Sequence, residues 1–268
     1  KLEKADLHFG LEYLGSFAFA YCTQLKTAYI PATVTGISGN PFLGCSSVES
    51  FTLDEDNADF VVKDGVLYDK TMYTLLYYPA SLTAETYEFP ASVHEIADGA
   101  FAGAQLKSVV IPDRITLIPD CAFQGSALES FTFHKGITRV GDYAFEGCAN
   151  LNNVTLLQTV KYAGNYAFAN CTSLSNFVFE EVPEGAEPYT IGNHFFDGCI
   201  SMTEVILPNY MMVTEEEYNT YFWMYYPDRT IPSYMFANTG IVHAVIPEWY
   251  VDFSTDGVFY GCANMETF

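Results

Sequence analysis

Histidines, cysteines and carboxylates are the side chains of this sequence whose chemistry suits catalysis or metal binding. None of the histidines stands in the His-Glu-x-x-His spacing of a zinc hydrolase or in a comparable metal-binding spacing. The sequence also lacks the Gly-x-Ser-x-Gly, Walker and Gly-x-Gly-x-x-Gly motifs of hydrolases and nucleotide-binding enzymes. We therefore predict no catalytic residue, no metal, no cofactor and no enzyme activity. The five histidines are His8, His94, His134, His194 and His243.

Carboxylates outnumber basic side chains by 33 to 11, which gives a formal net charge of −22. A surface this acidic disfavours nucleic acid and anionic membranes as partners, because both carry negative charge. The acidic residues are spread over exposed repeat positions, which indicates a solvated surface and not an acid–base pair held in a cleft. Two acidic clusters, at 180–187 and 215–217, lack the loop spacing of a calcium site.

Composition places the chain among folded proteins. Half of the residues are hydrophobic, which is enough to build a core and excludes a disordered chain. No apolar run approaches the roughly 18 residues of a membrane span, so we expect no membrane insertion by this chain.

A repeat organises nearly the whole sequence. Its anchor is a Phe, usually followed two residues later by Gly or Asn and then often by Cys. The basic unit is 22–23 residues long, and three insertions interrupt the series. Repetition at this period is the signature of a solenoid. The anchors are Phe19, Phe42, Phe101, Phe123, Phe145, Phe168, Phe196, Phe236 and Phe259.

Each repeat position has a structural interpretation. The segment Leu-x-x-Val-x-Ile, as in Leu151, Val154 and Leu156, alternates apolar and polar residues and predicts a half-buried strand. Strands that recur once per repeat stack in parallel. Gly and Asn tolerate positive φ, so their position after the anchor predicts a left-handed residue. Around the Ala-Phe of each anchor we predict a single helical or 3-10 turn.

The cysteines follow the same repeat. Six of the seven lie three residues after an anchor Phe, and the seventh, Cys121, lies outside that position. Units that lack this Cys also have a turn shorter by one residue, which ties the Cys to a turn variant. We predict buried free thiols that donate to turn carbonyls. The six are Cys22, Cys45, Cys148, Cys171, Cys199 and Cys262.

The unit resembles the BspA-type leucine-rich repeat of bacterial surface proteins. The likeness is carried by IPDRITLIPDCAFQGSALESFTF (Ile111–Phe133), by GITRVGDYAFEGCANLNNVTL (Gly136–Leu156) and by DGVLYDKTMYTLLYYPA (Asp64–Ala80). It implies a leucine-rich-repeat solenoid: a right-handed superhelix of stacked units of about 23 residues. In that fold a parallel β-sheet lines the concave face, and short turns with single helical or 3-10 turns form the convex face. We expect residues 1–268 to form one array of about nine anchored units.

Insertions interrupt the array at 54–90, 180–189 and 208–230. In the first, Asp64-Gly65 between two apolar runs predicts a hairpin. Two further predicted strands, Leu75–Pro79 and Tyr87–Pro90, indicate a sheet that runs unbroken through the insertion. The second is acidic and contains Pro, which predicts a surface loop. The third is rich in Tyr, Trp and Met. No polar cap is visible at the C-terminus, so we expect this chain to be a piece of a longer protein.

Two surfaces are candidate contact sites. One outward column of the predicted sheet becomes apolar toward the C-terminus, where it and a neighbouring column contain Val178, Ile206, Val242 and Val245. The other candidate is the aromatic insertion, which either binds a partner through exposed rings or folds over the apolar sheet. Its candidate residues, with one aromatic beyond it, are Tyr221, Trp223, Tyr225, Tyr226 and Trp249.

Three functions remain open at this stage. The resemblance implies an exported, non-enzymatic module at the bacterial cell surface that recognises or adheres to a protein or cell-surface partner. The first alternative is a carbohydrate-binding module that stacks sugars on the aromatic residues of the insertion. The second is a structural spacer in a larger surface protein.

Overall fold

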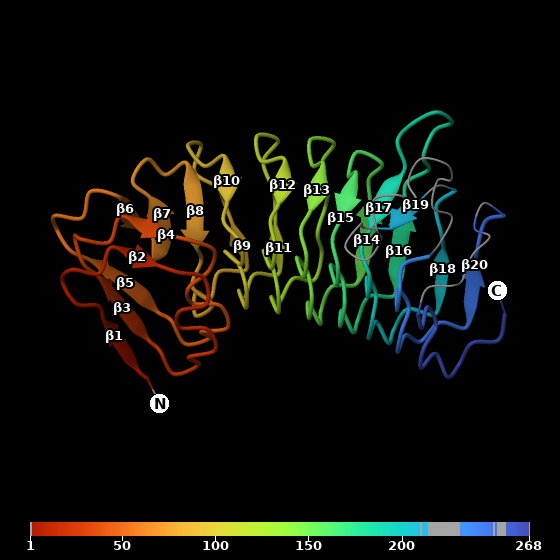
Figure 1. The fold of residues 1–268 in the computed structure, drawn as a ribbon, viewed down its shortest axis with the longest axis horizontal. Coiled ribbons are helices and arrows are strands. Elements are labelled where there is room, and N and C mark those ends of the chain that lie inside the picture. Colours follow the sequence, from red (N-terminus) through yellow and green to blue (C-terminus); the bar gives the residue numbers. More distant parts are fainter. Residues whose placement is uncertain (1, 210, 214–230, 249, 251–255, 268) are drawn as a thin grey trace, which may run out of the picture.

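In the computed structural model the chain forms an elongated solenoid whose coils stack side by side along one axis (Figure 1). The structure describes residues 2–209, 211–213, 231–248, 250 and 256–267. About nine coils with a repeat of about 23 residues are present, and their strands pair mainly in parallel. The predicted solenoid of stacked units is therefore confirmed.

Most coils contribute one strand to each of two rows; in the coil of Phe131 the first-row segment forms only an isolated bridge, from Ser130 to Asn153. The first row contains the predicted Leu-x-x-Val-x-Ile strands. The second row contains shorter strands that precede the anchor Phe. The first-row strands are β1 (Lys4–Asp6), β3 (Thr27–Ile30), β5 (Ser50–Leu53), β9 (Thr86–Tyr87), β11 (Ser108–Val109), β14 (Asn153–Leu156), β16 (Asn176–Phe179), β18 (Glu204–Ile206) and β20 (His243–Val245). The second-row strands are β2 (Tyr13–Leu14), β4 (Gly36–Ile37), β8 (Thr74–Tyr77), β10 (Glu95–Ile96), β12 (Leu117–Ile118), β13 (Arg139–Val140), β15 (Tyr162–Ala163), β17 (Tyr189–Ile191) and β19 (Met211–Val213).

The first insertion forms an antiparallel meander, so the expectation of an unbroken sheet is wrong. Strand β6 (Phe60–Lys63) pairs antiparallel with β7 (Val66–Asp69), and β7 pairs antiparallel with β8. The predicted hairpin is confirmed, with Asp64 and Gly65 both at positive φ (52° and 83°). Because β8 continues into the second row through β10, the first row stops at β5 and resumes at β9.

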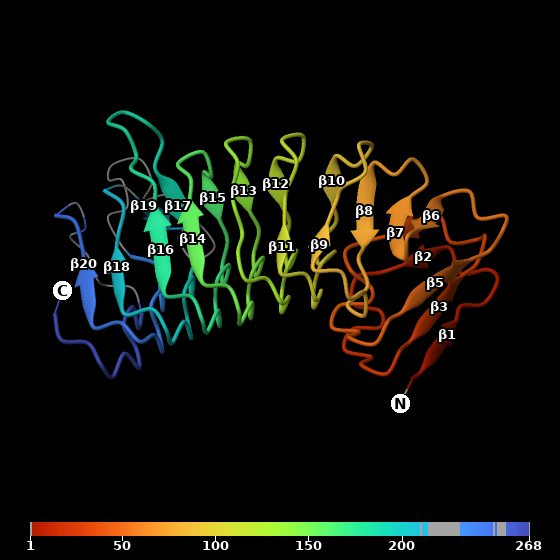
Figure 2. The ribbon, with the colours of Figure 1, turned by 180° about the vertical axis from the view of Figure 1, so that it is seen from behind.

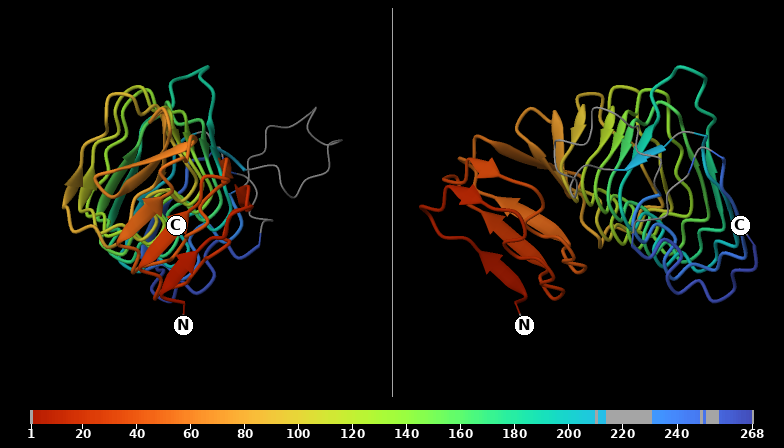
Figure 3. Two further views of the ribbon diagram at one scale, coloured as in Figure 1. Left: turned by 90° about the vertical axis from the view of Figure 1, so that its left-hand side faces the viewer. Right: turned by 45° about the vertical axis from the view of Figure 1, so that its right-hand side comes forward.

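The meander also divides the hydrophobic core in two. Neighbouring residues of β7 point to opposite sides. Leu67 packs into the core of the N-terminal coils with Phe42, whereas Tyr68 packs into the long core of the remaining coils with Phe101. Figure 3 shows the N-terminal strands, in red, tilted away from the regular coils on the other side of the meander.

The turns that carry the anchor Phe are not helical, which corrects the predicted helical or 3-10 turns. The described residues contain no helix. In these turns, backbone N–H groups alternate between partners: Ala102 donates to Gly99 of its own coil (2.9 Å), and Gly103 donates to Gln124 of the next coil (2.8 Å). A helix would keep all of these bonds within one coil. In these turns, every second backbone N–H instead bonds to the next coil and so joins the coils together.

This alternation requires two left-handed residues in each turn. The predicted position two residues after the anchor is confirmed, at φ values of 53° to 77° from the second anchor onward. A second left-handed position lies two residues before the anchor. The residues at the first position are Gly44, Gly103, Gly125, Gly147, Asn170, Gly198, Asn238 and Gly261, and those at the second include Gly99, Cys121, Tyr143, Tyr166, His194 and Tyr234.

The anchor phenylalanines form a ladder in each of the two cores, from Phe19 to Phe42 and from Phe101 to Phe259. Phe145 lies parallel to Phe123 and Phe168, with ring centroids 5.3 and 5.0 Å apart, and is fully buried. Phe131 of the first-row segment meets its edge at 4.7 Å. Stacked and edge-to-face pairs at these distances contribute beyond the area they bury.

The predicted thiol donation to turn carbonyls is confirmed at five of the six positions, although Cys22 and Cys262 are only half-buried. All seven are free. In five coils the thiol donates to the carbonyl of the anchor Phe in the preceding coil, at 2.9 to 3.1 Å. The carbonyl therefore gains a partner in the interior, where an unpaired acceptor would be costly. The five thiols are those of Cys45, Cys148, Cys171, Cys199 and Cys262.

This arrangement predicts slow thiol chemistry and a loss of stability in alkali. Burial raises the pKa of Cys45 to about 11 and that of Cys199 to about 12, against about 8.5 for an unfolded Cys. Above about pH 8.5 the unfolded state loses these protons first, so stability falls as pH rises toward 12 and is unaffected by these groups below pH 8. We expect iodoacetamide to label both residues only after urea unfolding, as measured by peptide mass mapping. Labelling of the native protein at pH 8 at the unfolded rate would contradict this assignment.

Candidate binding surface

The first strand row exposes a column of apolar side chains in its C-terminal half. Strand β14 pairs with β16 so that Thr155 faces Val178, and β18 pairs with β20 so that Ile206 faces Val245. These strands lie side by side in Figure 2. Val178 is 43%, Ile206 60% and Val245 50% exposed. The predicted apolar column therefore exists on the surface of the described residues.

The strand alternation explains both this exposure and its composition. In β16, Phe177 and Phe179 are buried and pack on the anchor ring of Phe196, so Val178 between them must face outward. In earlier coils the same column contains exposed threonines, at Thr132 and elsewhere. Valine and isoleucine are therefore not required here by the fold.

Polar residues border the column. Ser175 donates to the Asn152 side chain at 2.9 Å, and the His243 ring lies 2.6 Å from the Thr267 hydroxyl. Val242, the candidate in the neighbouring column, is half-buried and lies immediately before β20. An apolar strip with a polar border is typical of a protein contact surface.

The five aromatic candidates lie outside the described residues. These are Tyr221, Trp223, Tyr225, Tyr226 and Trp249. They remain predictions.

An aromatic ladder on the turn side was missed by the sequence analysis. The rings of Tyr143, Tyr166, His194 and Tyr234 stack across four coils, with centroids 4.9, 4.3 and 4.7 Å apart and planes within 9°. The His194 ring is also 2.9 Å from a carboxylate oxygen of Asp197. Each ring stands two residues before an anchor Phe, a spacing visible in the sequence. The ring faces are occupied by one another, so the ladder reinforces coil stacking and offers no flat platform to a sugar.

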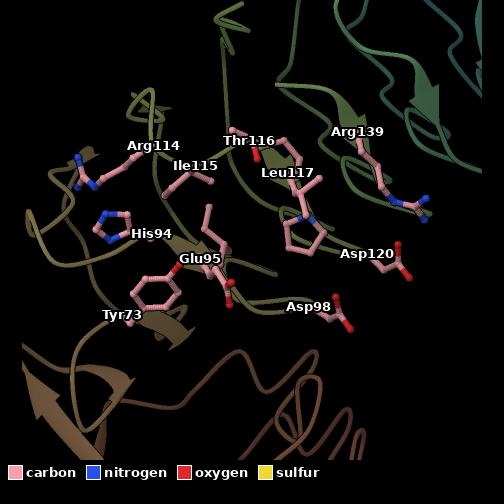
Figure 4. A pocket seen from close by; sticks show the side chains of 13 residues that line it. Tyr73, His94, Glu95, Asp98, Arg114, Ile115, Thr116, Leu117, Asp120 and Arg139 are labelled. Atoms are coloured by element: carbon pink, nitrogen blue, oxygen red, sulfur yellow. The ribbon is translucent and has the colours of Figure 1, made fainter. Parts of the chain in front are cut away.

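A pocket of about 500 Å³ lies on the second strand row and was also missed (Figure 4). It opens between β10 and β12, where the row is not hydrogen-bonded. Its walls include Tyr73, Glu95, Arg114 and Leu117. No sequence motif marks it.

Within the described part of the chain, no group of three or more His, Cys, Asp or Glu side chains lies close enough together to hold a metal ion. No helix among these residues is long and apolar enough to cross a membrane.

The repeat pattern and the fold agree with a profile of the BspA type leucine rich repeat region, which matches residues 1–66, 70–186 and 190–266. The chain belongs to the BspA-type leucine-rich repeat family. A search of curated proteins by sequence found no match.

Several solved bacterial protein structures share the fold. A leucine-rich repeat protein from Eubacterium ventriosum superposes with a TM-score of 0.57 at 19% identity, over 81% of this chain and 67% of its own. The pneumococcal vaccine antigen PcpA gives a TM-score of 0.53 at 18% identity, over 94% and 59%. A leucine-rich cell surface protein from Faecalibacterium prausnitzii gives 0.50 at 24% identity, over 67% and 60%. The present chain thus spans about 60% of the length of the last two.

Proposed function

We propose that this chain is a non-enzymatic recognition module at the bacterial cell surface that binds a protein partner through the apolar column of Val178, Ile206 and Val245. The observation that carries the proposal is the exposure of these three side chains in succession, in a column whose two preceding positions are Thr132 and Thr155. Family membership supports the location, since one solved relative is a cell surface protein.

The energetics suit a modest protein contact. Covering the exposed half of each side chain would contribute roughly 1 kcal/mol, so the three together contribute roughly 3 kcal/mol. That is enough to form the centre of an interface if the polar border excludes water. The net charge of −22 favours a neutral or basic partner and speeds its approach.

The test compares a triple substitution with a matched single one. We expect V178T/I206T/V245T to weaken binding to a responding member of a panel of matrix and cell-surface proteins by at least about ten-fold. Threonine keeps the shape and strand preference of valine and already occupies this column. Val110, which is 81% exposed in the same column but distant from the C-terminal half, provides the control: V110T should leave binding unchanged. Surface plasmon resonance measures both.

The aromatic insertion is tested in the same experiment with W223A/Y225A/Y226A. Protein binding that survives this variant and is lost in the triple threonine variant supports the proposal. Loss of protein binding only in the aromatic variant would move the contact to the insertion. Binding to a glycan panel that depends on these rings would favour a carbohydrate-binding module instead. No binding to either panel would favour a spacer and contradict the proposal.

A further inference from the structure

The second strand row is interrupted between two neighbouring coils. On the N-terminal side of the interruption, the Ala97 N–H donates to the Leu75 carbonyl at 2.9 Å. On the C-terminal side, the Gly141 N–H donates to the Ile118 carbonyl at 2.8 Å. Strands β10 and β12, between these two pairs, lie next to each other but are not hydrogen-bonded.

Proline at position 119 explains the interruption. Pro119 occupies the repeat position of Ala97, Gly141, Gly164 and Gly192, counted from each anchor. It has no N–H to donate to the Ile96 carbonyl. It also has a ring where the next three coils have glycine.

The glycines show how little room this position has. A Cβ added to Gly141 would lie 2.5 Å from the Asp120 nitrogen and 2.6 Å from the Pro119 carbonyl carbon of the preceding coil. A pyrrolidine ring at the same position therefore keeps β12 away from β10. The pocket of about 500 Å³ lies at this opening.

The pocket has an apolar floor. Ile96, Ile115 and Ile118 lie beneath it and are buried, while Leu117 stands 50% exposed in its wall. The rings of Tyr73 and His94 stack at one end, 5.0 Å apart. Such a lining accepts an aliphatic chain.

The two arginines that line the pocket make their contacts with other groups than the pocket carboxylates. Arg114 donates to the carbonyls of Val93 and Pro90 at 2.5 and 2.8 Å, and the Arg139 guanidinium lies 4.1 Å from the Tyr162 ring centroid. Figure 4 shows these two side chains extending toward opposite sides, with Glu95 between them.

The carboxylates of the pocket lack a cationic partner. Glu95, Asp98 and Asp120 take part in no ion pair within the described residues. The pKa of Asp98 is raised by burial and by the neighbouring charge of Asp120, a repulsion that a cation would relieve.

We propose that this groove binds an extended basic segment of a partner protein. A lysine or arginine side chain lays its aliphatic stem over Leu117 and places its charge at Glu95 and Asp98. The site lies on a different strand row from the apolar column, so either can fail without the other.

The experiment uses a fluorescein-labelled twelve-residue peptide that alternates lysine and threonine, with the glutamate–threonine peptide as a negative probe. Fluorescence polarisation measures binding at 50 and 150 mM salt. We expect E95Q/D98N to weaken binding by at least about five-fold. E181Q/E184Q, which removes two charges from the exposed loop at 180–189, should change it less than two-fold.

P119G is the decisive variant because it leaves the charge unchanged. It restores the missing N–H and the small residue of the later coils, so β10 and β12 should pair and close the groove. We expect about ten-fold weaker peptide binding, with circular dichroism unchanged; P183G in the exposed loop is the matched control. Equal binding by P119G and the parent chain would show attraction to net charge alone and overturn the proposal. Equal binding by E95Q/D98N and E181Q/E184Q would also overturn it.

Discussion

Replacing Phe145 with alanine is expected to lower the free energy of unfolding by about 3–5 kcal/mol. Phe145 is fully buried and stacks on Phe123 and Phe168, so its removal interrupts the ladder in the longer core. The neighbouring coils are held by their own backbone bonds and cannot collapse fully into the space. The loss therefore combines transfer, cavity and ring–ring contributions.

Urea unfolding followed by far-ultraviolet circular dichroism measures this loss. F9A provides the control, because Phe9 is 85% exposed and its removal should change stability by less than about 0.5 kcal/mol. A loss below about 1 kcal/mol for F145A would mean that the Phe ladder does not hold the coils together.

The second large effect is expected from Gly192→Ala. The added Cβ would lie 2.3 Å from the Asn165 nitrogen and 2.4 Å from the Gly164 carbonyl carbon, both backbone atoms of the preceding coil. Since backbone cannot rotate away as a flexible side chain does, the two coils must separate. The Gly192 N–H bond to the Ala163 carbonyl, now 2.8 Å, would lengthen with them. We expect a loss of at least about 2 kcal/mol.

Gly15 provides a matched control for this substitution. It occupies the same repeat position in the first coil, where an added Cβ would meet nothing within 4 Å. G15A should be neutral or stabilise the fold by about 0.4–1 kcal/mol, because alanine restricts the unfolded chain. Similar midpoints of thermal unfolding for G192A and G15A would contradict the close approach of the coils.

The first strand row could be predicted because its signal is local. Leu151, Val154 and Leu156 alternate with polar residues, and this period alone determines which side chains face inward. The same alternation placed Val178, Ile206 and Val245 on the surface. The structural role of the cysteines was also predictable, because their presence varies with the length of the turn.

The turn conformation, the meander and the groove depend on contacts between coils, which the sequence of one segment does not reveal. The turns looked helical because Ala-Phe favours a helix, but their N–H groups alternate toward the next coil and force Tyr143 and His194 to positive φ. The full meander was missed because β7 is buried on both faces, a pattern that is equally compatible with a parallel strand. The groove was missed because Pro119 matters only against its neighbours in the adjacent coils.

The central claim is that the apolar column of the first strand row contacts a protein partner. Site-specific photo-crosslinking tests it most directly, with benzoylphenylalanine in place of Ile206 and, as a control, in place of the exposed Thr138 on the second row. Incubation with intact cells or matrix, followed by mass spectrometry, identifies what is captured. The account predicts one specific protein crosslinked from position 206 and not from position 138. The same captured proteins from both positions, or none from position 206 when the chain is bound to cells, would contradict it.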